Sequence, residues 1–208
     1  MPIEGTHYTA GVTDPMPSLP SRPAAGTFLV ASPGLMDPNF THAVVLVCRH
    51  SPEGTYGLIV NRRTNRNVAD LESDAPLLTG RTDPLFLGGP VADDTLQILH
   101  RSEHAVPGGL PVLGDTVLGG DPAILGHLLP GTTPPDEPGE DVRFVLGCSG
   151  WGEGQLDSEI REGAWVVCEA EERFVFDPDP ETVWRRVLRS LGPPWSALAD
   201  LPPDPSWN

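Results

Sequence analysis

Five polar side chains stand where apolar segments end, and their types could form one binding site. Asn61 and Arg62 follow one predicted strand, His100 ends another, and Gln155 and Glu159 lie at the start of a predicted helix. Because each side chain can leave the core while its backbone stays fixed, the five would suit a preorganised site. We expect Glu159 to be the counter-ion of Arg62 in a partly exposed cleft. In the alternative interpretation, each residue satisfies a separate backbone group at a separate turn.

The densest chemistry-bearing segment is LGCSGWGEGQLDSEI, residues 146–160. A strand that enters a glycine-rich turn and leaves into a helix has the geometry that binds phosphate. Gly150, Gly152 and Gly154 lack the spacing of a dinucleotide motif, however, and three carboxylates lie where an anion would sit. Glycines that allow positive φ around an anchoring Trp151 are the simpler interpretation.

Sequence patterns for a catalytic nucleophile or for a metal site are weaker than this glycine-rich segment. Ser149 lacks the second glycine of a nucleophile elbow, and no histidine follows it. Cys148 could be a nucleophilic thiol or a buried and inert one, and the sequence leaves both interpretations open. The histidines show no metal-ligand spacing, so we predict no metal, and we predict no other cofactor. The absence of lysine excludes a P-loop and a Schiff-base enzyme.

Two functions from different classes fit these residues. The first is a binding or regulatory module whose unknown small-molecule or protein partner occupies a cleft lined by the five side chains. The second is a small hydrolase- or transferase-like enzyme, with His50 or His100 as general base and Glu159 as the acid or as the group that orients the base. A histidine–carboxylate hydrogen bond beside a hydroxyl or thiol would favour the enzyme.

Composition narrows the partners and the compartment. The 208 residues carry a formal net charge of −16, and all 13 basic residues are arginine. Such a chain repels phosphate backbones, which disfavours direct DNA binding. Three cysteines without a C-x-x-C pair indicate reduced thiols in the cytoplasm. Neither a signal peptide nor a membrane-spanning run is expected.

Proline and glycine mark the expected domain limits. Residues 1–26 predict a disordered N-terminal extension, and residues 193–208 predict a proline-rich C-terminal tail. Between them, residues 27–192 predict one compact domain. A chain near this length buries enough apolar surface to need no disulfide or metal.

The expected elements within that domain favour an α+β fold. Residues 42–50 are apolar nearly throughout and predict a strand buried on both faces. Residues 164–170 and 173–177 predict a hairpin. The Asp-Pro pairs at 121–122 and 179–180 predict helix starts, because aspartate caps free amides and proline there sacrifices no hydrogen bond. Strands outnumber helices and do not alternate with them.

Several motifs in a fixed order carry a family resemblance. The segments SPGLMDPNFTHAVVLVCRHSPEGTYGLIVNRRT, LGGPV, LQILH and FVLGCSGWGEGQLDSEIREGAW follow one another over residues 26–192. Together they closely resemble the YqgE/AlgH family of bacterial proteins. Two positions depart from the family pattern: Arg63 stands where proline is usual, and Cys148 stands where an aromatic residue is common.

The resemblance implies a fold and leaves the activity open. It implies a compact α+β domain with an irregular, barrel-like, mainly antiparallel sheet flanked by helices. It also implies a cytosolic protein of a family that carries a transcriptional-regulator label without an established activity. Because Cys148 replaces an aromatic residue, a family-wide role for that thiol is not expected.

Overall fold

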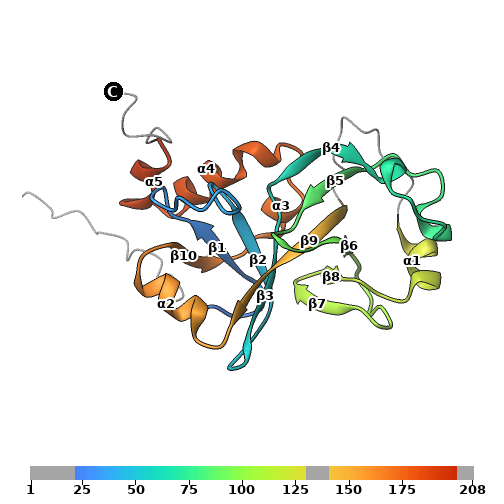
Figure 1. The fold of residues 1–208 in the computed structure, drawn as a ribbon, viewed down its shortest axis with the longest axis horizontal. Coiled ribbons are helices and arrows are strands. Elements are labelled where there is room, and N and C mark those ends of the chain that lie inside the picture. The colour runs from blue at the N-terminus through green and yellow to red at the C-terminus, as the bar shows by residue number, and fades with distance from the viewer. Residues whose placement is uncertain (1–21, 130–140, 201–208) are drawn as a thin grey trace, which may run out of the picture.

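One eleven-residue strand, β9 (Val142–Gly152), joins the two halves of this computed structural model, which describes residues 22–129 and 141–200. β9 pairs with β3 and β6 in antiparallel orientation and with β5 in parallel orientation. Figure 1 shows β1, β2, β3 and β10 on one side of β9, and β4 to β8 on the other. Both halves therefore depend on the same strand.

The described strands form one open sheet in the order β10-β1-β2-β3-β9-β6-β8-β7, to which β5 adds through β9 and β4 through β5. The other strands are β1 (Thr27–Ala31), β2 (Val44–Ser51), β3 (Gly54–Ile59), β4 (Arg63–Asn67), β5 (Pro84–Leu87), β6 (Val91–Arg101), β7 (Leu110–Leu113), β8 (Thr116–Leu118) and β10 (Trp165–Glu169). The helices are η1 (Val68–Asp70), η2 (Pro76–Leu78), α1 (Pro122–Leu128), α2 (Gln155–Arg161), α3 (Glu172–Val175), α4 (Pro180–Ser190) and α5 (Trp195–Leu198). The predicted α+β class is confirmed, and the irregular sheet does not close into a barrel.

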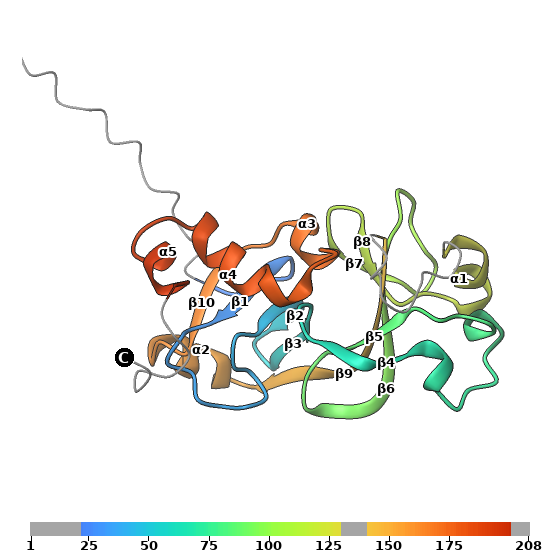
Figure 2. The same ribbon diagram turned by 90° about the horizontal axis from the view of Figure 1, so that it is seen from above.

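Strand β2 is buried on both faces, as its sequence predicts. Val44, Leu46 and Cys48 belong to a core cluster that includes residues of α4. Val45 and Val47 belong to a second cluster that includes residues of α2. Figure 2 shows α4 and α5 on one side of this part of the sheet and α2 on the other. The alternation of side chains along a strand thus divides one apolar run between two cores.

Both Asp-Pro pairs begin helices, as predicted. The Asp121 side chain accepts a hydrogen bond from the amide of Ala123 at 2.8 Å and caps α1. Helix α4 begins at Pro180, although the side chain of Asp179 makes no capping bond. The fixed φ of proline at the first helical position suffices there.

The hairpin expected over residues 164–177 is wrong in its second half. β10 forms and pairs with β1, but the following segment makes the one-turn helix α3. That segment covers the buried side chain of Arg143, which donates a hydrogen bond to the carbonyl of Asp177 at 2.7 Å. The guanidinium carbon also lies 5.8 Å from the ring centroid of Phe176. These tertiary contacts outweigh the strand-like alternation of the local sequence.

The predicted domain limits stay predictions. The extension predicted for residues 1–26 falls largely outside the described residues, and so does the end of the predicted tail. Just beyond residue 192 the chain forms α5, and Ala199 is 0% exposed in the cluster that also contains α4. The described residues contain no helix with the length and apolar character needed to cross a membrane.

The two halves of the sheet meet where two backbones cross at glycines. A Cβ atom on Gly89 would lie 2.3 Å from the carbonyl oxygen of Cys148, and one on Gly88 would lie 2.5 Å from that of Gly147. The backbone φ of Gly89 is +147°, which side-chain-bearing residues rarely adopt. The hydroxyl of Ser149 donates a hydrogen bond to the carbonyl of Gly88 at 2.9 Å. This crossing requires glycine.

We expect Gly89→Ala to lower the free energy of unfolding by about 3 kcal/mol or more, because it adds backbone strain and a steric clash. The control is Gly150→Ala in β9, where no atom lies within 4 Å of the added Cβ and φ is not positive. The control should change stability by less than about 1 kcal/mol. Urea unfolding followed by far-ultraviolet circular dichroism measures both, and equal losses would contradict the crossing.

Candidate functional site

The carboxylate of Glu159 accepts hydrogen bonds from two tryptophans. Its Oε2 accepts from Nε1 of Trp151 at 2.9 Å and from Nε1 of Trp165 at 2.8 Å. Its Oε1 accepts from the side-chain amide of Gln155 at 3.0 Å, and Gln155 in turn accepts from the amide of Gly152 at 3.1 Å. Gln155 and Glu159 are four residues apart, so α2 places them on one face. Together they hold α2 against the end of β9 and the start of β10.

An aromatic ring from another segment completes this cluster. Phe40 stacks on Trp151 with ring centroids 5.9 Å apart and meets Trp165 edge-on at 5.3 Å. Both tryptophans are buried. Aromatic pairs of this kind contribute about 0.5–1.5 kcal/mol each beyond their buried area. Phe40 belongs to the segment Asp37–His42 between β1 and β2, called here loop 37–42, and it holds one side of that loop.

Asn61 holds the end of loop 37–42 where β2 begins. Its Oδ1 accepts a hydrogen bond from the amide of Val44 at 2.8 Å, and its Nδ2 donates to the carbonyl of His42 at 2.9 Å. The side chain therefore replaces strand pairing at a point where the backbone turns. Asn61 is half-buried, and its role is to fix the loop.

Arg62 holds the middle of the same loop. Its guanidinium donates to the carbonyl of Thr41 at 2.9 Å and also to that of Asn39. Burial lowers the pKa of this guanidinium, and the negative charge of Asp37 opposes that change. The predicted ion pair with Glu159 is wrong: within the described residues Arg62 forms no ion pair, and Glu159 is occupied by the indoles.

His100 lies away from these contacts, in the half of the sheet formed by β4 to β8. It is 1% exposed, and its Nε2 lies 2.9 Å from the carbonyl oxygen of Gly119. Its Nδ1 lies 3.3 Å from the carbonyl oxygen of Arg101. With both ring nitrogens facing carbonyls in the core, His100 presents none to a ligand. Asn61 and Arg62 thus contact loop 37–42 directly, whereas Gln155 and Glu159 bond to the cluster of tryptophans on which Phe40 packs. His100 contacts neither group.

The sequence analysis missed His42, which ends the loop. Its φ is +55°, and its ring lies 4.2 Å from the ring of Trp184 on α4, centroid to centroid. Burial lowers the pKa of His42, and the guanidiniums of Arg185 and Arg62 lower it further. Neither the positive φ of His42 nor its ring contact with a distant helix can be recognised from the neighbouring sequence.

Arg185 brings a second cation to this surface. It is exposed on α4 next to Trp184, and across the described ranges it has no ion-pair partner. By contrast, Arg186 pairs with Asp177, and Arg189 with Asp200, on the same helix. We call the surface made by loop 37–42, Asn61, Arg62 and Arg185 the loop face.

The remaining candidate nucleophiles and ligands show little activation. Burial raises the pKa of the Cys48 and Cys168 thiols to about 12, and it raises the pKa of Cys148 as well. His50 is exposed, and its Nδ1 lies 2.7 Å from the hydroxyl oxygen of Thr55. In the described parts of the chain, no three histidine, cysteine or acidic side chains gather as a metal site.

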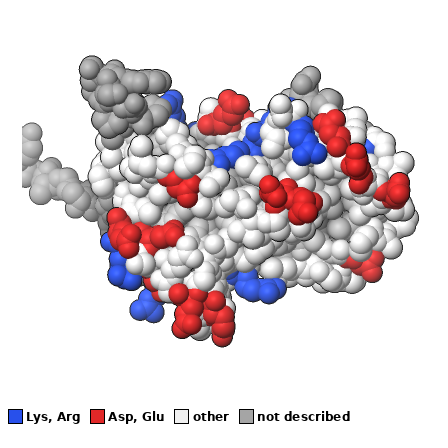
Figure 3. All heavy atoms as spheres, in the orientation of Figure 1, with Lys and Arg blue, Asp and Glu red and all other residues white. Residues whose placement is uncertain are grey.

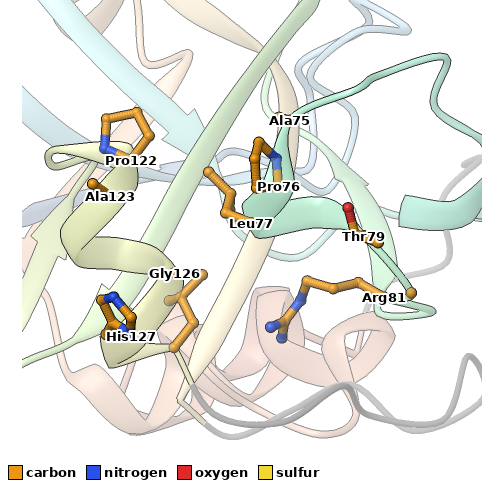
Figure 4. A pocket seen from close by; sticks show the side chains of 11 residues that line it. Ala75, Pro76, Leu77, Thr79, Arg81, Pro122, Ala123, Gly126 and His127 are labelled. Carbon is orange, nitrogen blue, oxygen red and sulfur yellow. The ribbon is translucent and has the colours of Figure 1, made fainter.

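A pocket of about 750 Å³ lies between η2 and α1, and none of the five predicted residues lines it. Figure 4 shows Pro76 and Leu77 of η2 opposite Pro122 and Gly126 of α1. Arg81 lines it too, but its guanidinium is engaged by Asp83 at 2.9 Å. Thr79 and His127 are its other polar lining residues, and no residue of the loop face lines it.

The protein is thus a single-domain α+β protein with an open ten-stranded sheet, and hydrogen bonds hold its loop 37–42 in place. The chain belongs to the AlgH-like family, whose model matches residues 28–196. A UPF0301 protein of Streptomyces coelicolor is 39% identical over 194 residues, which cover 88% of this chain and 94% of that protein. A UPF0301 protein of Chlorobium luteolum is 36% identical over 188 residues, covering 90% and 96%.

Two solved structures are similar to this fold. The solution structure of the AlgH protein from Pseudomonas aeruginosa matches with a TM-score of 0.62 and 28% identity, over 92% of this chain and 98% of that one. The crystal structure of a Corynebacterium diphtheriae protein matches with a TM-score of 0.68 and 25% identity, over 86% and 93%. The resemblance drawn from the ordered motifs is confirmed, and the names of these relatives state no activity.

We expect Glu159→Ala to lower the free energy of unfolding by about 3 kcal/mol, because two buried indole N–H groups lose a charged acceptor. Glu159→Gln should lose less, since one amide oxygen can still accept. Glu162→Gln is the matched control: Glu162 is exposed on the next turn and accepts from Ser158 at 2.9 Å. Urea unfolding should show a change within about 0.5 kcal/mol for the control. Equal stability of all three variants would contradict the role of Glu159.

We expect Arg185→Gln to raise the pKa of His42 toward its ordinary value, because one of two neighbouring cations is removed. In the wild-type chain the lowered pKa of His42 means that the unfolded state binds this proton more readily. Stability therefore falls as the pH drops below the ordinary histidine pKa of about 6.5, and the variant should lose less.

Nuclear magnetic resonance titration of the histidine rings measures the pKa of His42 directly. Arg189→Gln on the same helix is the control, because Arg189 is paired with Asp200 and does not act on His42. An unchanged pKa of His42 in Arg185→Gln would show that Arg185 does not reach the loop.

Proposed function

We propose that this chain is a cytoplasmic binding or regulatory protein that recognises an anionic group of a small molecule at the loop face. One observation carries the proposal. Arg62 donates to the carbonyls of Asn39 and Thr41 next to His42, and Arg185 follows Trp184, whose ring contacts His42. Across the described residues neither arginine forms an ion pair with a carboxylate. In a chain of net charge −16, two cations left without such partners mark a surface prepared for an anion.

The loop face is held in place before any ligand arrives. Arg62 is fixed by two loop carbonyls, Asn61 by the loop end, and Phe40 by the tryptophan cluster. A site whose groups are already ordered loses little conformational entropy on binding. The carboxylate of Asp37 opposes the lowering of the pKa of Arg62, and its Oδ1 already accepts from the amide of Asn39 at 2.8 Å.

Overall charge favours a small ligand over a polyanion. Figure 3 shows acidic side chains spread over the visible face, with basic side chains gathered in a few places. A small anion meets only the local cations, whereas a nucleic acid also meets the repulsion of the whole chain. Direct DNA binding is therefore disfavoured. The three free, buried cysteines support a reducing, cytoplasmic location.

Catalysis by a histidine–carboxylate pair has less support. The carboxylate of Glu159 already accepts three hydrogen bonds, and the ring nitrogens of His100 both face carbonyls. Neither Glu159 nor His100 is free to exchange a proton with a substrate. For His50, the other predicted base, the hydrogen bond seen among the described residues is to the hydroxyl of Thr55 and not to a carboxylate. Binding is the function that these contacts support best.

The test is a titration of the full chain with citrate, followed by nuclear magnetic resonance of the histidine rings. A bound anion offsets the charges of Arg62 and Arg185, so the pKa of His42 should rise on binding. Arg185→Gln should weaken citrate binding about tenfold, the effect of losing one charge-assisted hydrogen bond. Arg189→Gln should bind as the wild type does. If millimolar citrate leaves the His42 signals unchanged, the loop face is not an anion site.

A further inference from the structure

A second basic surface lies at the other end of β2, around two adjoining hollows. The larger, about 420 Å³, is lined by Arg22, Pro23, His50, Asp157, Ile160 and Arg161. The smaller, about 70 Å³, shares His50 and Asp157 and reaches the glycine turns at Gly54 and Gly152. Figure 3 shows basic side chains beside acidic ones at this edge of the molecule, near α2 of Figure 1. We call the two hollows together the His50 hollow.

The ring of His50 is oriented by a buried hydroxyl. Its Nδ1 lies 2.7 Å from Oγ1 of Thr55, and Thr55 is only 7% exposed. Thr55 is itself fixed by strand pairing, opposite His50 on β2 and opposite Trp151 on β9. With Nδ1 engaged, Nε2 is the ring nitrogen that can meet a ligand.

The charges around the hollow favour an anion. Arg22 and Arg161 line it from two different segments, and in residues 22–129 and 141–200 neither forms an ion pair. Asp157 is the one carboxylate that lines either hollow. Planar guanidiniums bind phosphate oxygens through paired hydrogen bonds, and the imidazole adds a third contact.

Asp157 narrows the ligand class further. A carboxylate beside a bound phosphate is unfavourable unless the ligand also presents a hydrogen-bond donor to it. A hydroxyl or amino group near the phosphate would meet that need. The volume of the larger hollow falls within the range of small-molecule sites, about 300–1,000 Å³, and exceeds what a bare phosphate fills.

We propose that the His50 hollow binds a small phosphate monoester that carries a hydroxyl or amino group. Arg22, Arg161 and His50 hold the phosphate, and Asp157 accepts from the donor. His42 precedes β2 and His50 lies near the end of that strand, eight residues later, so the two histidines are separated by up to about 26 Å at about 3.3 Å per residue. This site is independent of the function proposed for the loop face.

The test uses the full chain with three probes: glycerol 3-phosphate, inorganic phosphate and glycerol. Calorimetry gives affinities, and the ring signals of His50 and His42 report where each probe binds. Glycerol 3-phosphate should shift the His50 signals and bind more tightly than inorganic phosphate, while glycerol alone should not bind. Arg161→Gln and His50→Asn should each weaken binding about tenfold.

Two control variants separate this site from the loop face and from general charge effects. Arg185→Gln and Arg173→Gln should leave binding at His50 unchanged; Arg173 is exposed and pairs with Glu171 instead. If only the His42 signals shift, or if Arg185→Gln abolishes binding, the ligand belongs to the loop face and the second site is refuted. If inorganic phosphate and glycerol 3-phosphate bound with equal affinity, the proposal that the ligand is a phosphate monoester would be refuted.

Discussion

Close contact between the backbones of Gly88–Gly89 and Gly147–Ser149 is the constraint on which the rest of the structure depends. Because no side chain separates the two segments, β9 can pair with β3 at one end and with β5 and β6 along the rest of its length. One strand then belongs to both halves of the sheet. Near this crossing the pairing of β6 with β9 shifts register between Val91 and Leu96.

The end of β9 also positions the loop face. Trp151 lies near the end of the strand, and its indole shares the carboxylate of Glu159 with Trp165 of β10. Burying two indole N–H groups without an acceptor would be unfavourable, so the carboxylate is required wherever both rings are buried. Phe40 then packs on the pair and positions loop 37–42. The loop is thus ordered by contacts that begin in the sheet.

Patterns in the sequence predicted the structural features that depend on residues close together in the chain. The apolar run of β2 and the Asp-Pro helix starts follow from periodicity and capping. The helix α3, the buried position of His100 and the real partners of Glu159 do not, because each depends on residues far away in the chain. His42 was missed for the same reason: its neighbours Arg62 and Arg185 come from two other segments.

The place of β1 in the sheet has a consequence for how the chain is made. β1 lies between β2 and β10, and the carbonyl of Ala31 at its end accepts a hydrogen bond from Trp184, 153 residues later. During synthesis the second edge of β1 therefore stays uncovered until β10 has also left the ribosome. Until then an apolar strand edge stays open to other chains, which is the situation in which nascent proteins aggregate. Completion of this part of the sheet thus depends on the arrival of β10 and α4.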